Sequence, residues 1–179
     1  MGVSSTNLIQ GPATLYHGAF GSAEPGTVAT VPGVAFTDVG GTKDGVSLIV
    51  ADEYAVLEVD QIIYEVARRR TKRVVQIKTQ MAEATLENLA RAVNNTAPSA
   101  SKLVADDGLT AFAPAYSAVI LDGIAPGGFK RRVIVRKVLA TDSVEVAYKK
   151  TDQSLIPVTF TAHWVSPSIK PFDVEDATV

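Results

Sequence analysis

The chain of 179 residues contains no cysteine, only two histidines and few aromatic residues, which make up 7% of it. Without cysteine the protein has no disulfides, no thiolate ligands for zinc and no cysteine nucleophile. No apolar run approaches the roughly 18 residues that a membrane-spanning helix needs. The N-terminus also lacks the charged start and apolar stretch of a secretory signal. We therefore expect a soluble protein that is made in the cytoplasm and does not bind membranes.

Patterns typical of catalytic sites are scarce. His17 and His163 both lie in strand-like runs, and the sequence has no Gly-x-Ser-x-Gly motif to present a serine to either of them. The nearest approach to a metal-binding cluster is Asp106 with Asp107, which also reads as an ordinary turn signal. We expect no enzymatic activity, no catalytic residue and no metal.

Two glycine-containing segments bear a superficial likeness to phosphate-binding loops. Residues 40–43 read Gly-Gly-Thr-Lys, but they lack the full phosphate-loop spacing and no helix follows them. Residues 127–130 precede a predicted strand, whereas a dinucleotide-binding loop precedes a helix. We interpret both segments as turns and expect no cofactor.

Charge is strongly segregated along the sequence, although the net charge is only −2. Residues 1–67 hold one basic and eight acidic side chains, whereas residues 68–150 hold fifteen basic and seven acidic ones. Opposed patches can attract copies of a protein head to tail, because complementary potentials steer encounter and fix register. The same charges can equally pair within one folded chain, where a surface pair contributes only about 0 to 1 kcal/mol. The sequence leaves both interpretations open.

The stretch 44–94 contains the clearest periodic patterns. Apolar and polar residues alternate in residues 55–60 and again in residues 73–79. A period of two is typical of strands with one buried face, so we expect two long strands joined by a basic turn at residues 68–73.

An amphipathic helix is predicted after these strands. Apolar residues recur there at the i, i+3, i+4, i+7 spacing of a helix that buries one stripe. This predicted core stripe consists of Leu86, Leu89, Ala90 and Val93. We expect Glu87, Asn88 and Arg91 to lie on the opposite, exposed side.

Further short strands are expected on both sides of this stretch. They are predicted at residues 13–17, 34–39, 46–51, 116–122, 130–139, 143–148 and 158–164. Residues 46–51 are apolar enough to be buried on both faces. Many short strands with one helix indicate a mainly β fold, either two packed antiparallel sheets or a partly closed barrel, with one flanking α-helix. The length fits a single domain over residues 1–179, with extended arms at about 1–12 and 165–179.

The basic cluster in the predicted turn is a candidate for contact with another molecule. It consists of Arg68, Arg69, Arg70, Lys72 and Arg73. Such a cluster can bind nucleic-acid phosphates regardless of sequence, but the chain is acidic overall and no aromatic residues interleave with the basic ones. A solvated hairpin tip is another interpretation. We favour a third, in which these residues contact an acidic patch on a neighbouring subunit.

The order of these features resembles the major tail tube proteins of bacteriophages with long, non-contractile tails. The resemblance rests on several motifs in sequence order and covers nearly the whole chain. They are a small polar N-terminal arm, DGVSL at residues 44–48, EVDQ at 58–61, a polar hairpin tip, AEATLENL at 82–89, and IPVTF at 156–160 before a proline-containing tail.

The resemblance implies the phage tail tube fold, a β-sandwich or barrel with a flanking helix. Six copies would form a ring whose inner sheets join into one continuous β-barrel, and stacked rings would form the tube that guides DNA out of the capsid. The implied partners are other copies of the chain, the tape measure protein and the tail terminator, and DNA would pass without specific binding. The implied location is the virion tail, after assembly in the host cytoplasm.

An acidic channel would repel the DNA duplex from its wall. The resemblance therefore makes Glu58, Asp60 and Glu65 candidates for lumen-facing positions, unless they form the solvated outer face. Two other functions stay open. One is another phage assembly role, such as a terminator, a decoration protein, or the tube of a bacteriocin or secretion device. The other is a small β-rich ligand-binding module, which would need a concave pocket that the sequence does not indicate.

Overall fold

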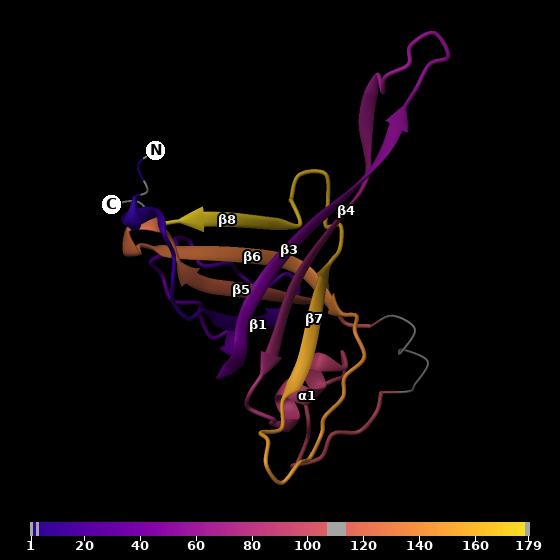
Figure 1. The fold of residues 1–179 in the computed structure, drawn as a ribbon. Coiled ribbons are helices and arrows are strands. Elements are labelled where there is room, and N and C mark those ends of the chain that lie inside the picture. Colours follow the sequence, from indigo (N-terminus) through magenta and orange to yellow (C-terminus); the bar gives the residue numbers. More distant parts are fainter. Residues whose placement is uncertain (1, 3, 107–113, 178–179) are drawn as a thin grey trace.

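A computed structural model describes residues 2, 4–106 and 114–177, and its eight strands form one antiparallel sheet (Figure 1). The strands are β1 Thr14–Ala19, β2 Phe36–Asp38, β3 Thr42–Leu57, β4 Ala67–Met81, β5 Ser117–Ile124, β6 Lys130–Ala140, β7 Ile156–Ala162 and β8 Phe172–Asp176. The strand order is β2-β1-β5-β6-β7-β4-β3, and β8 pairs with β6 off this path. Within the described residues the only α-helix is α1, Leu86–Ala92, and it is too short to span a bilayer.

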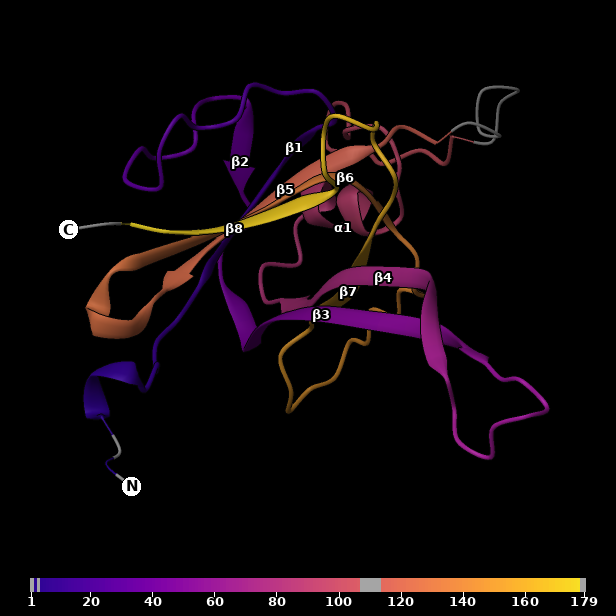
Figure 2. The same ribbon diagram turned by 90° about the horizontal axis from the view of Figure 1, so that it is seen from above.

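The sheet folds over itself at β6. Most of β6 pairs with β5 and β8, whereas only its last residues, 138–140, pair with β7. The strands β1, β5, β6 and β8 cross β3, β4 and β7 at a large angle (Figure 1), and seen from above the two groups lie in separate layers (Figure 2). The main core lies between these halves and includes Leu15, Val119, Val135, Ile77, Ile156 and Phe160.

The predicted mainly β character is confirmed, but the prediction of two separate sheets is wrong. The two layers are halves of one sheet, because β6 contributes ladder pairs to both of them. The sheet is also not closed into a barrel, since β2 and β3 end the strand order without pairing with each other.

The outer face of the β1–β5–β6 half carries a second, smaller core and a buried ion pair. Arg132 is 1% exposed and donates from Nε and Nη2 to the two carboxylate oxygens of Asp122, at 2.6 and 2.7 Å. Its Nη1 donates to the carbonyl of Thr27 at 2.9 Å, which ties the loop before β2 to the sheet. Burial alone would raise the pKa of Asp122, but hydrogen bonds from Arg132 and Lys130 lower it overall. A buried charge left unpaired would cost several kcal/mol, so this pair fixes the loop in place.

A buried asparagine anchors α1. Asn88 is 2% exposed, and its Nδ2 donates to the carbonyls of Val39 at 2.8 Å and Glu83 at 2.9 Å. Its backbone N–H donates to the hydroxyl of Thr85 at 3.2 Å, so Thr85 is the N-cap of the helix. The side chain therefore satisfies the buried carbonyl of Val39 and adds a second donor to the carbonyl of Glu83, which also accepts from the N–H of Thr85.

The predicted core stripe of this helix is only partly correct. Ala90 is buried and Leu89 packs against the main core, as expected. Val93 is 47% exposed, however, because the helix ends at Ala92 and Val93 has left helical geometry. Asn88, predicted on the exposed side, points inward. Leu86 is partly buried.

Two predicted strands and one predicted arm also differ from the structure. Residues 143–148 form no ladder, although Val144 and Val146 still pack against the core. Residues 46–51 are not buried on both faces, because only Val46 and Leu48 pack against the main core, whereas Ile49 and Val50 are exposed. The segment 165–179, predicted as an extended arm, includes β8.

We expect Asn88→Leu to lower the free energy of unfolding by about 1–3 kcal/mol, because the buried carbonyl of Val39 loses its donor. Urea unfolding followed by circular dichroism measures this. Gln153→Leu is the matched control, since Gln153 also donates to a carbonyl, that of Ala82, but is exposed. The control should stay within about 0.5 kcal/mol of the parent. Equal losses in both variants would contradict the role of Asn88.

Candidate functional site

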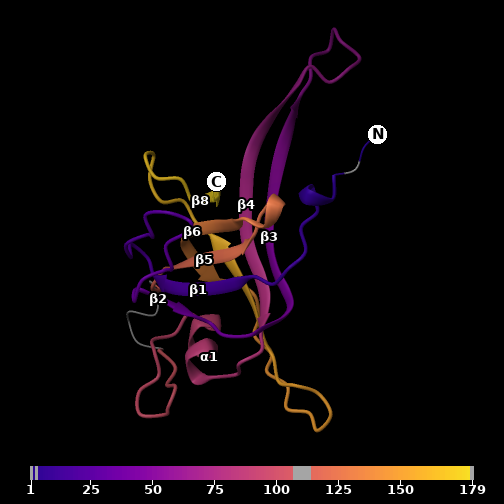
Figure 3. The same ribbon diagram turned by 90° about the vertical axis from the view of Figure 1, so that its left-hand side faces the viewer.

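Strands β3 and β4 extend beyond the body of the protein as a two-stranded ribbon (Figures 1 and 3). We call residues 52–73 the arm and residues 58–66 its tip. Where the ribbon crosses the body, Ile77 is fully buried and Leu48 packs against the main core. Every residue from 53 to 73 is exposed. The arm is therefore the largest part of the described chain that has no contact with a core.

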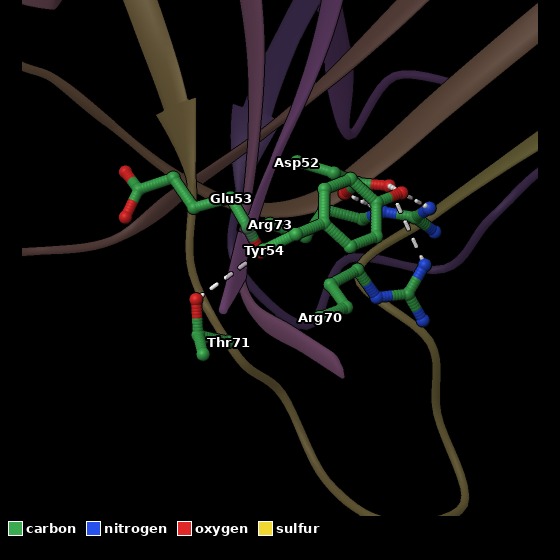
Figure 4. Close-up of polar contacts among 6 residues, drawn as sticks. All are labelled: Asp52, Glu53, Tyr54, Arg70, Thr71 and Arg73. Atoms are coloured by element: carbon green, nitrogen blue, oxygen red, sulfur yellow. Dashed lines mark hydrogen bonds and ion pairs between the residues drawn. The ribbon is translucent and has the colours of Figure 1, made fainter. Parts of the chain in front are cut away.

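Asp52 is the centre of a polar cluster at the base of the arm (Figure 4). Arg73 donates to its two carboxylate oxygens from Nε and Nη2, at 2.6 and 2.7 Å. The hydroxyl of Tyr54 donates to Asp52 Oδ2 at 3.2 Å, and Arg70 Nη1 lies 3.5 Å from the same oxygen. These contacts, with the Arg73 hydrogen bond foremost, hold the pKa of Asp52 well below its usual value. The cluster keeps the two strands together where support from the core ends.

A β-bulge in β4 makes this cluster possible. Lys72 pairs with Glu53 and Arg70 pairs with Tyr54, so Thr71 is an extra residue in the ladder. Its hydroxyl donates to the carbonyl of Glu53 at 3.1 Å. Because side chains alternate along a strand, the extra residue brings Arg70 onto the same face as Arg73 and Asp52 (Figure 4). Without the bulge the two arginines would lie on opposite faces.

Most of the basic residues predicted to contact a neighbouring subunit pair within their own arm. Arg70 and Arg73 contact Asp52, Lys72 Nζ lies 3.1 Å from Glu53 Oε1, and Arg68 Nε lies 2.8 Å from Glu65 Oε2. Within the described residues Arg69 has no carboxylate within 4.0 Å. Within one chain, four of these five residues therefore have an acidic partner, and their contact with a neighbouring subunit stays a prediction.

The prediction of a basic turn is wrong. Residues 68–73 belong to β4, and the turn that joins the strands is residues 58–66. A solvated ribbon has polar residues on both faces, so its sequence looks like a turn. Glu58, Asp60 and Glu65, predicted to face a lumen, all lie in this exposed tip. Whether they face DNA stays a prediction.

The tip combines these acids with exposed apolar side chains. The exposed fractions are 44% for Val59, 51% for Ile62, 100% for Ile63, 82% for Tyr64 and 52% for Val66. In a single chain these apolar side chains stay in contact with water, so they add no stability through burial. The tip is therefore a candidate surface for contact with another molecule.

The outer edge of β3 is a second surface open to another chain. β3 pairs with β4 along one edge, and no strand of the described residues pairs with its other edge. An unpaired edge of this length can accept a strand from another molecule. The tip and this edge belong to the same hairpin.

A cavity of about 990 Å³ lies between β1, α1 and the segments on either side of residues 107–113. Its lining includes His17, Thr37, Arg91, Asn94, Pro98 and Ser117. The sequence did not indicate this cavity, because its walls come from segments far apart in the chain. Burial lowers the pKa of His17 to about 4, and the charge of Arg91 acts in the same direction. His17 is therefore neutral at pH 7.

The other residues considered for chemistry are placed as follows. His163 packs edge-on against Tyr116, with ring centroids 5.3 Å apart, and its Nε2 is buried without a hydrogen-bond partner. Residues 127–130 form the predicted turn, and Gly127 has a φ of 78° that favours glycine. No group of three potential metal ligands occurs among the described residues, and Asp107 lies outside them.

The chain matches no protein-family model and no curated protein. The functional argument therefore depends on the arm, the open β3 edge and the cavity. Of these three features, the arm indicates a function most directly, because it has a defined internal structure and an exposed apolar end.

We expect Asp52→Asn to loosen the arm without unfolding the body, because the carboxylate that accepts from Arg73, Arg70 and Tyr54 is lost. Hydrogen exchange should become several-fold faster for the arm amides and stay unchanged for the β5 amides. Lys72→Gln is the control, since it removes a single exposed pair and should change exchange much less. Unchanged arm exchange in Asp52→Asn would show that the cluster does not hold the strands together.

We expect protein stability to fall as the pH drops from 6.5 towards 4. In this range unfolded His17 gains a proton and folded His17 does not, so protonation favours the unfolded chain by up to about 3 kcal/mol. Thermal unfolding of the parent and of His17→Gln between pH 7.5 and 4.5 measures this. The variant should show a flatter pH profile. Parallel profiles would contradict a buried, neutral His17.

Proposed function

We propose that this chain is a structural protein that self-assembles into stacked hexameric rings and forms a phage tail tube, the conduit for DNA ejection. The observation that carries the proposal is the arm, an ordered ribbon that leaves the body and ends in exposed apolar side chains. The role requires no catalytic group, cofactor or metal. The proposed location is the virion tail.

The energetics of the arm support self-association. A two-stranded hairpin is only marginally stable by itself in water, and its exposed ion pairs contribute about 0 to 1 kcal/mol each. Burial of a side chain the size of Ile63 or Tyr64 contributes about 1.5–3 kcal/mol. Burial of both side chains against another chain would therefore contribute an amount comparable to or larger than that of the arm's ion pairs together.

The direction of the arm supports a repeating contact instead of a closed pair. The arm leaves one end of the body, and α1 lies at the opposite end (Figures 1 and 3). If the tip contacts a different surface on the next chain, the same contact can repeat along an axis without closing. The open edge of β3 supports ring formation in addition, since pairing with a strand of a neighbouring chain would remove that edge.

The pairing of the basic residues suits a tube that DNA passes through without specific binding. On β6, Arg131 pairs with Asp176, Arg132 with Asp122 and Arg136 with Glu24. Guanidinium groups that are already paired with carboxylates neutralise fewer DNA phosphates and so release fewer counterions from the DNA, which weakens binding. The tape measure protein and the tail terminator would be the other partners.

The same arm would also suit a terminator, a decoration protein, or the tube of a bacteriocin or secretion device. Gene order distinguishes these roles, because a tail tube gene should precede a very long tape-measure gene.

The cavity beside α1 favours a second candidate function, a β-rich ligand-binding module. Polar groups from His17, Arg91 and Asn94 line it together with apolar residues, as in many small-molecule sites. Ligand-observed NMR with a fragment library tests this function. Binding that Arg91→Ala or Asn94→Ala abolishes would support it, and an absence of hits would reject it.

Electron microscopy of the concentrated protein tests the proposed function, with rings or hollow tubes as the expected result. We expect Ile63→Asp to abolish assembly and to leave monomer stability within about 0.5 kcal/mol, because Ile63 contacts no core. Val34→Asp is the matched control, since Val34 is a fully exposed apolar residue outside the arm, and it should assemble normally. A parent that stays monomeric at every concentration and salt would reject self-assembly. Normal tubes of Ile63→Asp would reject the arm as the contact.

A further inference from the structure

Strand β8 is attached to the body by few buried contacts. Phe172 is the only β8 side chain that packs against the main core among the described residues, and Val174 is 46% exposed. Glu175 and Asp176 are exposed. The strand pairs with β6 along one edge only, from Arg131↔Asp176 to Val135↔Phe172. It therefore belongs to the least stable part of the sheet.

Charge-assisted hydrogen bonds hold β8 in register. Arg131 donates to the two carboxylate oxygens of Asp176 at 2.6 and 2.8 Å. Arg136 pairs with Asp173, and it also donates from Nη1 to the carbonyl of Lys170 at 2.9 Å. These contacts specify which strand fits the edge of β6. The partly exposed Arg131–Asp176 pair contributes little stability. The Arg136 side chain is only 16% exposed, so β8 is held more firmly at its Phe172 end than at its Asp176 end.

The segment before β8 leaves the body as a loop. Residues 163–171 contain no helix or strand and include Pro167 and Pro171 (Figure 1). Trp164 and Ile169 in this segment are 68% and 48% exposed. If these nine residues were extended, they would span up to about 30 Å. The strand could therefore reach β6 of an adjacent chain without any change in the rest of the fold.

We propose that β8 is an exchangeable strand, which leaves its own β6 and pairs with β6 of a second copy of this chain. The receiving surface fits the incoming strand by construction, because it is the surface that the chain's own β8 occupies. Both arrangements have the same ladder and the same arginine–aspartate pairs. The equilibrium between the intramolecular and the exchanged arrangement is therefore set by the local concentration of chains and by the length of the loop 163–171.

Strand exchange goes beyond the proposed function, since it requires only that two chains meet. It would tie neighbouring subunits together by main-chain hydrogen bonds. A surface contact could separate in one step, whereas exchanged subunits would separate only after β8 leaves β6.

Cross-linking of single-cysteine variants tests the exchange, because the chain has no cysteine of its own. Val133 and Val174 are cross-strand partners, so cysteines at these positions lie within disulfide distance. Val133→Cys and Val174→Cys proteins are mixed at the concentration used for assembly, oxidised, and separated on a non-reducing gel. We expect a disulfide-linked heterodimer. Arg131→Cys with Asp176→Cys is a second cross-strand pair at less buried positions, in case a buried cysteine impairs folding, and it replaces the Arg131–Asp176 ion pair.

The matched control is Val133→Cys mixed with Leu121→Cys. These residues are also cross-strand partners, but Leu121 lies in β5, a buried central strand that cannot leave without global unfolding. Heterodimer several-fold above this control supports exchange. Heterodimer no higher than the control overturns it, provided that Val133→Cys/Val174→Cys in one chain forms its internal disulfide. Tubes without cross-links would refute strand exchange and leave the proposed function intact. Cross-links without tubes would support strand exchange and count against the proposed function.

Discussion

The whole fold depends on the register between β5 and β6. Asp122 and Arg132 are cross-strand partners in these strands, and both are buried. A slip of one residue would turn the side chains of β6 to the opposite faces, and the charge of Arg132 would then enter the main core in place of Val133. Because β6 also supplies the pairing edges for β7 and β8, this ion pair fixes the position of both halves of the sheet.

The segregation of charge along the sequence is largely removed by folding. Acids from the first third of the chain pair with bases from the middle, as in Asp52 with Arg73 and Glu24 with Arg136. The protein therefore has fewer free charges than its sequence indicates. Two of the surfaces that stay available for contact are the tip of the arm, which combines apolar side chains with Glu58 and Asp60, and the main-chain groups of the open edge of β3.

Alternation of apolar and polar residues located most strands, because one face of each lies on a core. It failed where this condition does not hold. The arm has no buried face, so residues 68–73 looked like a turn, and residues 143–148 alternate but have no neighbouring strand to pair with. The inward position of Asn88 depends on the carbonyls of Val39 and Glu83, which only the folded chain brings near it. The cavity was not predictable for the same reason.

The arm also sets the distance between its tip and the body of the protein. A strand rises about 3.4 Å per residue, so the paired part of the ribbon can change length only in steps of that size. Loss of one facing pair would move the tip inward by one step and turn its side chains to the opposite face of the ribbon. Loss of two pairs would shorten the ribbon by about 7 Å and restore the original faces. Ribbon lengths that keep the tip correctly oriented therefore differ by an even number of facing pairs. Only a discrete set of distances between the tip and the body is compatible with one orientation of the tip.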